Sequence, residues 1–287
     1  MKEEDLVLGD GRTLHYYDWK PGFSEPELTV FWHHGTPNIG MPPAPLFAAS
    51  VEMGIRWIGY DRPGYGGSTA RSGRDVASCA DDVARIADQL GVERFAVMGH
   101  SGGGPHALAC AALLPKRVLA AVGIAGLAPF DAAGLDWFAG MAPSGAASLR
   151  AAVQGHAAKV HHEAHSAARS QECDRALFTP ADWAALSGPW SWFDSVVGPA
   201  MASGQEGLID DDLAYVAPWG CDCARIVRPV LLVHGMQDRV VPAAHGQWLA
   251  RACHSAELWL QPDDGHISVL NGAVAALAWL REHGRPA

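Results

Sequence analysis

The sequence has few of the features that mark membrane, secreted or nucleic-acid-binding proteins. No stretch approaches the roughly 18 uninterrupted apolar residues of a membrane-spanning helix. The acidic start, Met1 to Asp5, lacks the apolar segment of a signal peptide. With 21 Lys and Arg against 31 Asp and Glu, the formal net charge is −10, and no basic run is present to bind a phosphate backbone. We therefore expect a soluble, cytoplasmic protein with no nucleic-acid partner and leave its oligomeric state open.

Cysteine is also scarce, and its spacing indicates neither a disulfide framework nor a metal site. The segment Cys221-Asp222-Cys223 lacks the two-residue gap and the partner pair that are typical of zinc. Three histidines lie between residues 161 and 165, but Glu163 does not complete an HExxH pattern, because the second histidine comes one residue early. We expect these histidines to lie on a solvated helix face, and we expect no metal or other cofactor.

What the chain does have is length, apolar content and alternation. Its 287 residues, 49% of them hydrophobic, can bury a large core in one domain with an insertion. Strand-like and helix-like segments alternate, and the clearest helix, over residues 76–90, has apolar residues at three- and four-residue spacing. This pattern predicts an α/β fold with a mostly parallel sheet covered on both faces. The predicted strands are residues 28–32, 56–60, 95–98, 118–124, 230–233 and 256–260, with a leading hairpin over 6–8 and 13–19.

The alternation stops after Gly126. Residues 127–219 contain Ala-rich, amphipathic stretches interrupted by prolines, which indicates a set of short helices. We interpret them as a helical lid inserted between an N-terminal core of residues 1–126 and a C-terminal core of residues 220–287. This insertion carries several aromatic residues that are candidates for lining an apolar substrate pocket: Trp137, Phe138, Trp190 and Trp192. The alternative is that most of them pack the insertion onto the body.

The segment Gly99-His100-Ser101-Gly102-Gly103 is the strongest indication of chemistry. An apolar run, residues 95–98, leads into it, and a helix-like run, residues 106–114, follows it. A serine between a strand and a helix lies on a tight, strained turn that exposes its hydroxyl, and the flanking glycines relieve the crowding of that turn. Ser101 is therefore the predicted nucleophile.

A serine hydroxyl is a weak nucleophile by itself, so it needs a base and an acid that orients the base. The predicted strand 230–233 is followed by a loop that carries Asp238, and the next strand is followed by a loop that ends in His266. Asp238 is the predicted acid and His266 the predicted base. Asp263 and Asp264 are second choices as the acid, because their short tether to the histidine points them away from its ring.

Taken together, these residues resemble a lid-bearing α/β-hydrolase of the esterase and lipase type, and the resemblance covers nearly all of the chain. The order Ser101, Asp238, His266 is the order that this fold uses. By this resemblance, Ser101 attacks an acyl carbonyl, His266 takes and returns the proton, and Asp238 orients and supports the imidazolium. Serine at the turn excludes the dehalogenase and epoxide hydrolase branches, which use an aspartate there.

The same resemblance implies an oxyanion hole. The family places a donor just after its third strand, where this sequence reads His34-Gly35-Thr36-Pro37, and the implied donors are the backbone N–H groups of Thr36 and Gly102. Many relatives carry a bulkier side chain, such as methionine, at the position of Gly102, so we expect extra room there. The glycine-rich turn over residues 61–68 matches the family as structural support, and it lacks the lysine-serine ending of a phosphate loop.

The reaction that this pattern favours is hydrolysis of a small or medium carboxylic ester, or a related thioester or lactone, through an acyl-enzyme. An apolar acyl group is expected, because the lid offers aromatic residues and no Arg cluster for a polyanion. A C–C bond hydrolase or a cofactor-free lyase with the same three residues stays open, as does a ligand-sensing homologue without turnover. An amidase of the proline iminopeptidase type would need carboxylates for the amino group, which the sequence does not identify among Glu163, Glu172 and Asp194.

Overall fold

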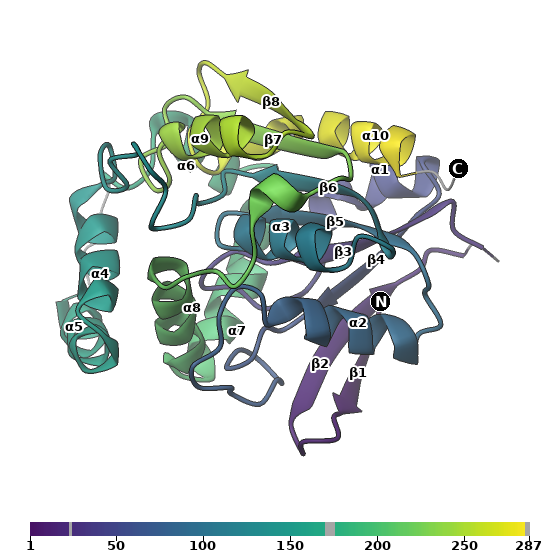
Figure 1. Cartoon of the computed structure of the whole chain (residues 1–287), viewed down its shortest axis with the longest axis horizontal. Helices are drawn as coiled ribbons and strands as arrows, with labels where there is room; N and C mark the ends of the chain where they lie inside the picture. The colour runs from purple at the N-terminus through teal and green to yellow at the C-terminus, as the bar shows by residue number, and fades with distance from the viewer. Residues whose placement is uncertain (23–24, 170–175, 285–287) are drawn as a thin grey trace.

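A sheet of eight strands forms the centre of the computed structural model, which describes residues 1–22, 25–169 and 176–284 (Figure 1). The strand order is β1-β2-β4-β3-β5-β6-β7-β8. Only β1 with β2 and β2 with β4 pair antiparallel, and the remaining neighbours pair parallel. The predicted α/β fold with a mostly parallel sheet is thus confirmed. The strands are β1 (Lys2–Val7), β2 (Thr13–Trp19), β3 (Leu28–His33), β4 (Ile55–Tyr60), β5 (Phe95–His100), β6 (Val118–Ile124), β7 (Val230–Gly235) and β8 (Ala256–Gln261).

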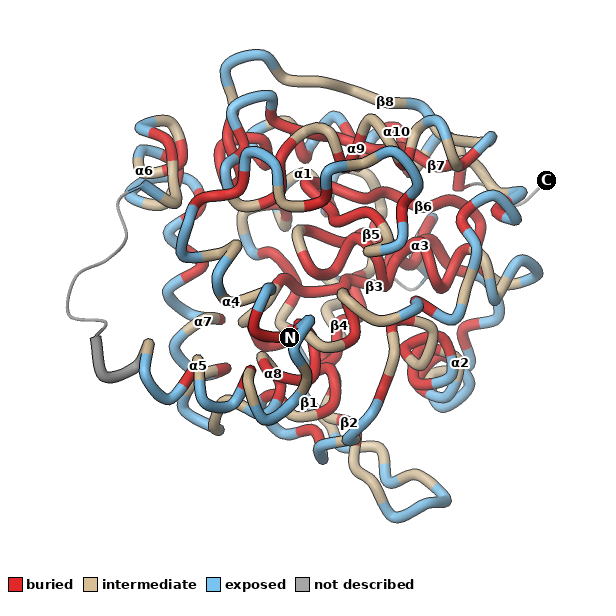
Figure 2. Tube along the Cα trace, turned by 60° about the vertical axis from the view of Figure 1, so that its left-hand side comes forward, coloured by how far each residue is buried: buried red, intermediate tan, exposed pale blue. Residues whose placement is uncertain are grey.

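Helices cover both faces of this sheet, because its central strands are apolar on both faces. Along β3, Phe31 belongs to one apolar core, whereas Val30 and Trp32 belong to the other. The first core includes residues of α2 (Cys79–Gln89), α3 (Gly103–Leu113) and α9 (Ala244–Ala252). The second includes residues of α10 (Ala273–His283), and the partly buried Phe47 of α1 (Phe47–Glu52) packs against it. In Figure 2 the buried residues concentrate in the central strands and in α3.

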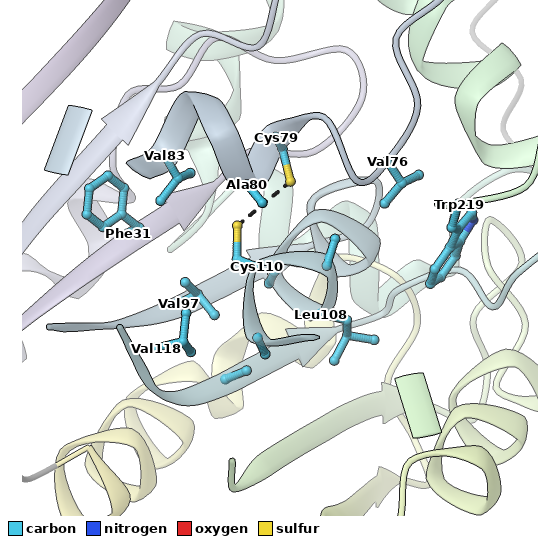
Figure 3. Packing of buried hydrophobic residues seen from close by; sticks show 14 of the residues in the cluster. Phe31, Val76, Cys79, Ala80, Val83, Val97, Leu108, Cys110, Val118 and Trp219 are labelled. Carbon is cyan, nitrogen blue, oxygen red and sulfur yellow. Dashed lines mark hydrogen bonds between the residues drawn. The ribbon is translucent and has the colours of Figure 1, made fainter. Parts of the chain in front are cut away.

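The core around α2 and α3 shows why these helices form where they do. Figure 3 shows Val83 of α2 and Leu108 of α3 among the apolar side chains that pack with Phe31 and Val97 of the sheet. The helix predicted over residues 76–90 begins instead at Cys79, because Asp75 and Ser78 exchange hydrogen bonds in the turn before it. These hydrogen bonds belong to the turn and do not cap the helix, and apolar spacing does not report such local polar interactions.

Among the described residues, five α-helices lie between β6 and β7, within the residues predicted as an inserted lid. In Figure 1, α4 and α5 form the outer edge of the molecule, and α8 lies between them and the body. Across the described ranges, no helix is long and apolar enough to cross a membrane. The inserted helices are α4 (Pro143–Val153), α5 (His156–Arg169), α6 (Pro180–Leu186), α7 (Asp194–Ala202) and α8 (Glu206–Val216). Short 3-10 helices are η1 (Ala44–Leu46), η2 (Ser191–Phe193), η3 (Cys223–Arg225) and η4 (Ser268–Gly272).

Candidate active site

Ser101 occupies a strained turn between β5 and α3. Its φ is 54°, and the only other described non-glycine residue with a positive φ is Ala125. The Ser101 N–H donates to the carbonyl of Ile124 at 2.8 Å, so the turn is held against the end of β6. A Cβ at Gly99 or Gly103 would collide with backbone of α3 or β3, which explains why glycine flanks the serine. The geometry matches the strained strand-to-helix turn expected for a nucleophile.

His266 lies between Ser101 and Asp238 and is within hydrogen-bonding distance of both. Its Nε2 is 2.9 Å from Ser101 Oγ, and its Nδ1 is 2.7 Å from Asp238 Oδ2. A carboxylate accepts only, so Nδ1 carries the proton and Nε2 is left to accept from the serine hydroxyl. The structure therefore brings together the three residues that the sequence selected from three separate loops.

Asp238 is fixed by the loop that carries it. The N–H groups of Val240 and Val241 both donate to its Oδ1 at 2.8 Å, which leaves Oδ2 for His266. The side chain is buried. Hydrogen bonds from two N–H groups compensate for the loss of water around a buried carboxylate.

The two residues implied as oxyanion donors line the same cavity as Ser101. In the described part of the chain, neither the Thr36 N–H nor the Gly102 N–H donates to another group. Backbone N–H groups that stay unpaired beside a nucleophile can receive the negative oxygen of a tetrahedral intermediate. This arrangement fits the role that the resemblance gives to Thr36 and Gly102.

The expected extra room at Gly102 is absent. A Cβ at this position would overlap the Tyr215 hydroxyl and Thr36 Oγ1. The Tyr215 hydroxyl donates to the Gly102 carbonyl at 3.1 Å and lies 2.8 Å from Thr36 Oγ1. Tyr215 comes from α8, more than a hundred residues later in the chain, so the sequence around Gly102 gave no sign of it. The space left by the missing side chain is thus filled by the insertion.

His34 and His100 are supporting residues beside the site. The N–H of Arg62 donates to His34 Nε2 at 3.0 Å, so His34 Nδ1 carries the proton and donates to the Gly35 carbonyl at 2.7 Å. His100 Nε2 lies 3.0 Å from the backbone carbonyl of His266. Burial, followed by the neighbouring His266, lowers the pKa of His100 to about 3. Both histidines are therefore neutral and hold backbone in place.

A cavity of about 310 Å³ opens at Ser101. Its apolar wall is aliphatic and includes Leu127 from the loop after β6 and Val240 and Val241 from the loop after β7. The four aromatic residues predicted to line it do not: Trp137, Phe138, Trp190 and Trp192. Trp137 and Phe138 instead pack with Phe130, and Trp190 and Trp192 join the core on the other side of the sheet. Their large apolar surface is used to attach the insertion to the body.

One wall of the cavity is polar and comes from the insertion. Ser148, Glu163 and Asp212 line it, and behind them the fully buried Lys159 Nζ lies 2.5 Å from an oxygen of each. The sequence predicts no role for Glu163 and does not single out Asp212. The ion pair of Lys159 with Asp212 joins α5 to α8 across 53 residues, which local spacing does not reveal.

The other residues that the sequence singled out in the insertion lie elsewhere or have another environment. Asp194 is exposed outside this cavity, and Glu172 lies outside the described residues. His162 lines the cavity as well, in contrast to the solvated face that was expected.

One group of metal-ligand side chains lies together among the described residues: His33, Cys79 and Cys110 have ligand atoms within 4.8 Å of one another. All three are buried. Figure 3 shows Cys79 and Cys110 facing each other, and their sulfur atoms are 3.8 Å apart. Structural zinc takes four ligands, so this group is incomplete for zinc. The other cysteine pair considered, Cys221 and Cys223, is not part of it, and Cys173 lies outside the described residues.

Comparison with known proteins agrees with the fold. The model of the "alpha/beta hydrolase fold" family matches residues 29–273. A "Non-heme chloroperoxidase" from Streptomyces lividans is 30% identical over 247 residues, covering 83% of each chain. A "2-hydroxymuconate semialdehyde hydrolase" from Pseudomonas putida is 27% identical over 93% of this chain and 89% of its own. The solved enol-lactonase from Burkholderia xenovorans LB400 superposes with a TM-score of 0.70 at 20% identity, over 98% of this chain and 99% of that one. The chain belongs to the α/β hydrolase fold family and is an enzyme of the hydrolase type.

Proposed function

We propose that this enzyme is a serine hydrolase that cleaves a small or medium carboxylic ester, or a related thioester or lactone, through an acyl-enzyme on Ser101. The observation that carries the proposal is the continuous set of hydrogen-bonding contacts from Ser101 Oγ through His266 to Asp238, at 2.9 and 2.7 Å, at the end of a cavity. A second observation supports it, since two unpaired backbone N–H groups, those of Thr36 and Gly102, line the same cavity.

The reaction proceeds in two steps on this geometry. Ser101 Oγ attacks the substrate carbonyl while His266 Nε2 accepts its proton, and Asp238 stabilises the imidazolium that forms. The carbonyl oxygen becomes negative and receives hydrogen bonds from the N–H groups of Thr36 and Gly102. His266 then donates the proton to the leaving alcohol. Water, deprotonated by His266, attacks the acyl-enzyme in the second step and releases the acid.

The walls of the cavity restrict the substrate. A volume of about 310 Å³ lies at the lower end of the range for ligand pockets, which favours small and medium acyl groups. Aliphatic side chains on one wall favour an apolar acyl portion. The carboxylates of Glu163 and Asp212 on the other wall disfavour an acyl group that carries a negative charge.

Cleavage of a C–C bond is the second candidate function, because the Pseudomonas putida relative is named a hydrolase of 2-hydroxymuconate semialdehyde. In such a reaction the same serine and histidine would act on a ketone whose leaving group is carbon. Stopped-flow traces with p-nitrophenyl esters of increasing acyl length distinguish the two. A burst of p-nitrophenol in the wild type that is absent from Ser101→Ala supports the esterase proposal. Failure of every ester, with turnover of a vinylogous 1,5-diketone, would favour C–C bond hydrolysis instead.

A further inference from the structure

A buried carboxylate on the insertion contacts the oxyanion loop and has no part in the mechanism above. Asp211 on α8 is fully buried, and its Oδ2 accepts hydrogen bonds from Thr36 Oγ1 at 2.5 Å and from the Tyr65 hydroxyl at 2.9 Å. Arg62 donates to both oxygens of this carboxylate, and Arg74 donates to Oδ1 at 2.6 Å. Burial alone would raise the pKa of Asp211, but the charges of the two guanidinium groups lower it well below its usual range. Asp211 is thus a charged acceptor.

The arginine that Asp211 orients holds the rest of the oxyanion loop. Arg62 Nη1 donates to the carbonyl of His34 at 2.5 Å, and Nη2 donates to the carbonyl of Gly35 at 3.2 Å. The direction of a peptide carbonyl fixes the direction of the next N–H, because the peptide unit is planar. The Gly35 carbonyl belongs to the peptide unit that carries the Thr36 N–H. Arg62 therefore sets the orientation of this oxyanion donor.

Gly102, the second proposed oxyanion residue, is contacted by the face of α8 that carries Asp211. Tyr215 follows Asp211 by one helical turn, and its hydroxyl donates to the Gly102 carbonyl at 3.1 Å. The hydroxyl also lies 2.8 Å from Thr36 Oγ1. One face of α8 therefore contacts both residues of the oxyanion hole.

We propose that Asp211 is a positioning residue for the oxyanion hole, acting through the Thr36 hydroxyl and through Arg62. The inference rests on the proposed function, since it assigns the Thr36 N–H to the developing oxyanion. It makes the insertion a part of the catalytic framework as well as a wall of the cavity. The expected loss on breaking the contact lies below the roughly hundredfold to thousandfold cost of removing an oxyanion donor, because the N–H itself remains.

The test measures the acylation rate and the substrate dissociation constant separately, in single-turnover experiments with p-nitrophenyl acetate. Thr36→Val keeps the branched shape and the backbone N–H but removes the hydroxyl, and it leaves the Asp211 ion pairs intact. We expect its acylation rate to fall about tenfold while the dissociation constant changes by less than about twofold. Thr36→Ser restores the hydroxyl and should recover most of the lost rate. Asp211→Asn should lower the rate at least as much as Thr36→Val.

Asp18→Asn is the matched control, because Asp18 also forms a bidentate ion pair, with Arg56 at 2.8 and 2.8 Å, and does not line the cavity. If Asp211→Asn fails to fold, the comparison of Thr36→Val with Thr36→Ser still tests the inference. Equal acylation rates for Thr36→Val and Thr36→Ser would overturn the inference, and so would a loss in Thr36→Val that appears only in substrate binding.

Labelling of wild-type Ser101 by a fluorophosphonate, followed by measurement of the intact protein mass, tests the proposed function separately. Absence of that adduct would overturn the proposed function and the inference with it.

Discussion

Asp182 of α6 accepts hydrogen bonds from the backbone N–H groups of Ile267 and Ser268, both at 2.8 Å. These two residues directly follow His266, so a carboxylate on the insertion fixes the backbone that carries the proposed catalytic base. The Ser268 hydroxyl donates to the same Oδ1 at 3.0 Å, and Thr179 donates to Oδ2 through its N–H and its hydroxyl, each at 3.0 Å. Like Asp211 and Tyr215 on α8, Asp182 connects the insertion to a catalytic loop.

Replacement of Asp182 tests this connection. Asp182→Ala leaves the buried N–H groups of Ile267 and Ser268 without an acceptor, and hydrogen bonds to a charged group contribute about 1.5 to 3 kcal/mol each. We expect the free energy of unfolding to fall by about 3 kcal/mol or more, together with a lower kcat for ester hydrolysis. Urea unfolding and steady-state kinetics check the two effects. Wild-type stability in the variant would show that α6 does not hold the loop.

Replacement of the three proposed catalytic residues should have graded effects on kcat. Ser101→Ala and His266→Ala should each lower kcat for an ester by about a millionfold, because the two groups act as one unit. Asp238→Asn should lower it by about ten thousandfold, because it disturbs the histidine tautomer while Ser101 and His266 remain. A Ser101→Ala and His266→Ala double variant should be no worse than either single one. A double variant in which the two losses of kcat multiply would contradict the claim that Ser101 and His266 act together in transferring one proton.

Gly102→Ala tests how α8 packs on the oxyanion hole. The new methyl group would overlap the Tyr215 hydroxyl and Thr36 Oγ1, so both must move. We expect kcat/KM to fall about a hundredfold for all acyl lengths, because a displaced Thr36 no longer aims its N–H at the oxyanion. Pairing this change with Tyr215→Phe, which removes one of the two overlapping groups, should recover part of the loss. A selective loss of long acyl chains alone would indicate a steric pocket instead.

Several buried histidines make stability depend on pH. Burial lowers the pKa of His33 and His100 to about 3 and that of His245 to about 4. In the unfolded chain these rings titrate near 6.5, so below that pH the unfolded state binds protons that the folded state does not. The free energy of unfolding should therefore fall as the pH drops from 7 to 5.5, by about 1 kcal/mol for each of these rings. Urea unfolding at pH 7 and at pH 5.5 measures this change. Equal free energies of unfolding at the two pH values would contradict the claim that these rings are buried in their neutral form.

The polar wall of the cavity should select against negative charge. Glu163 and Asp212 both line the cavity, so a monosuccinate ester should have a kcat/KM well below that of the butyrate ester with the same alcohol. Glu163→Gln removes one of the two negative charges and should reduce the ratio of kcat/KM between the butyrate and the succinate ester by about tenfold. Asp194→Asn, an exposed residue outside the cavity, serves as the control. A wild-type preference for the succinate ester would show that the positive charge of Lys159 outweighs the two carboxylates.

The sequence predicted what depends on local pattern. The strands match those observed to within a few residues, and the turn at Ser101 was predicted because strand, turn and helix are contiguous. Asp238 and His266 followed from their places after two predicted strands. The contacts that join the insertion to the site could not be predicted in this way, because Asp211 is 149 residues from Arg62 and Asp182 is 86 residues from Ser268. Sequence alone does not decide whether an aromatic residue lines a pocket or packs in the core, since a large apolar ring suits both, and here the four rings pack in the cores.

The central claim is that Ser101 becomes acylated during turnover, and mass spectrometry of acid-quenched enzyme tests it most directly. Wild-type enzyme is mixed with p-nitrophenyl butyrate, quenched within the burst and digested. We predict a butyryl group on the peptide that contains Ser101 in the wild type, its build-up in variants that deacylate slowly, and its absence from Ser101→Ala. Steady turnover of the ester with no acyl adduct on Ser101 at any quench time would contradict the account.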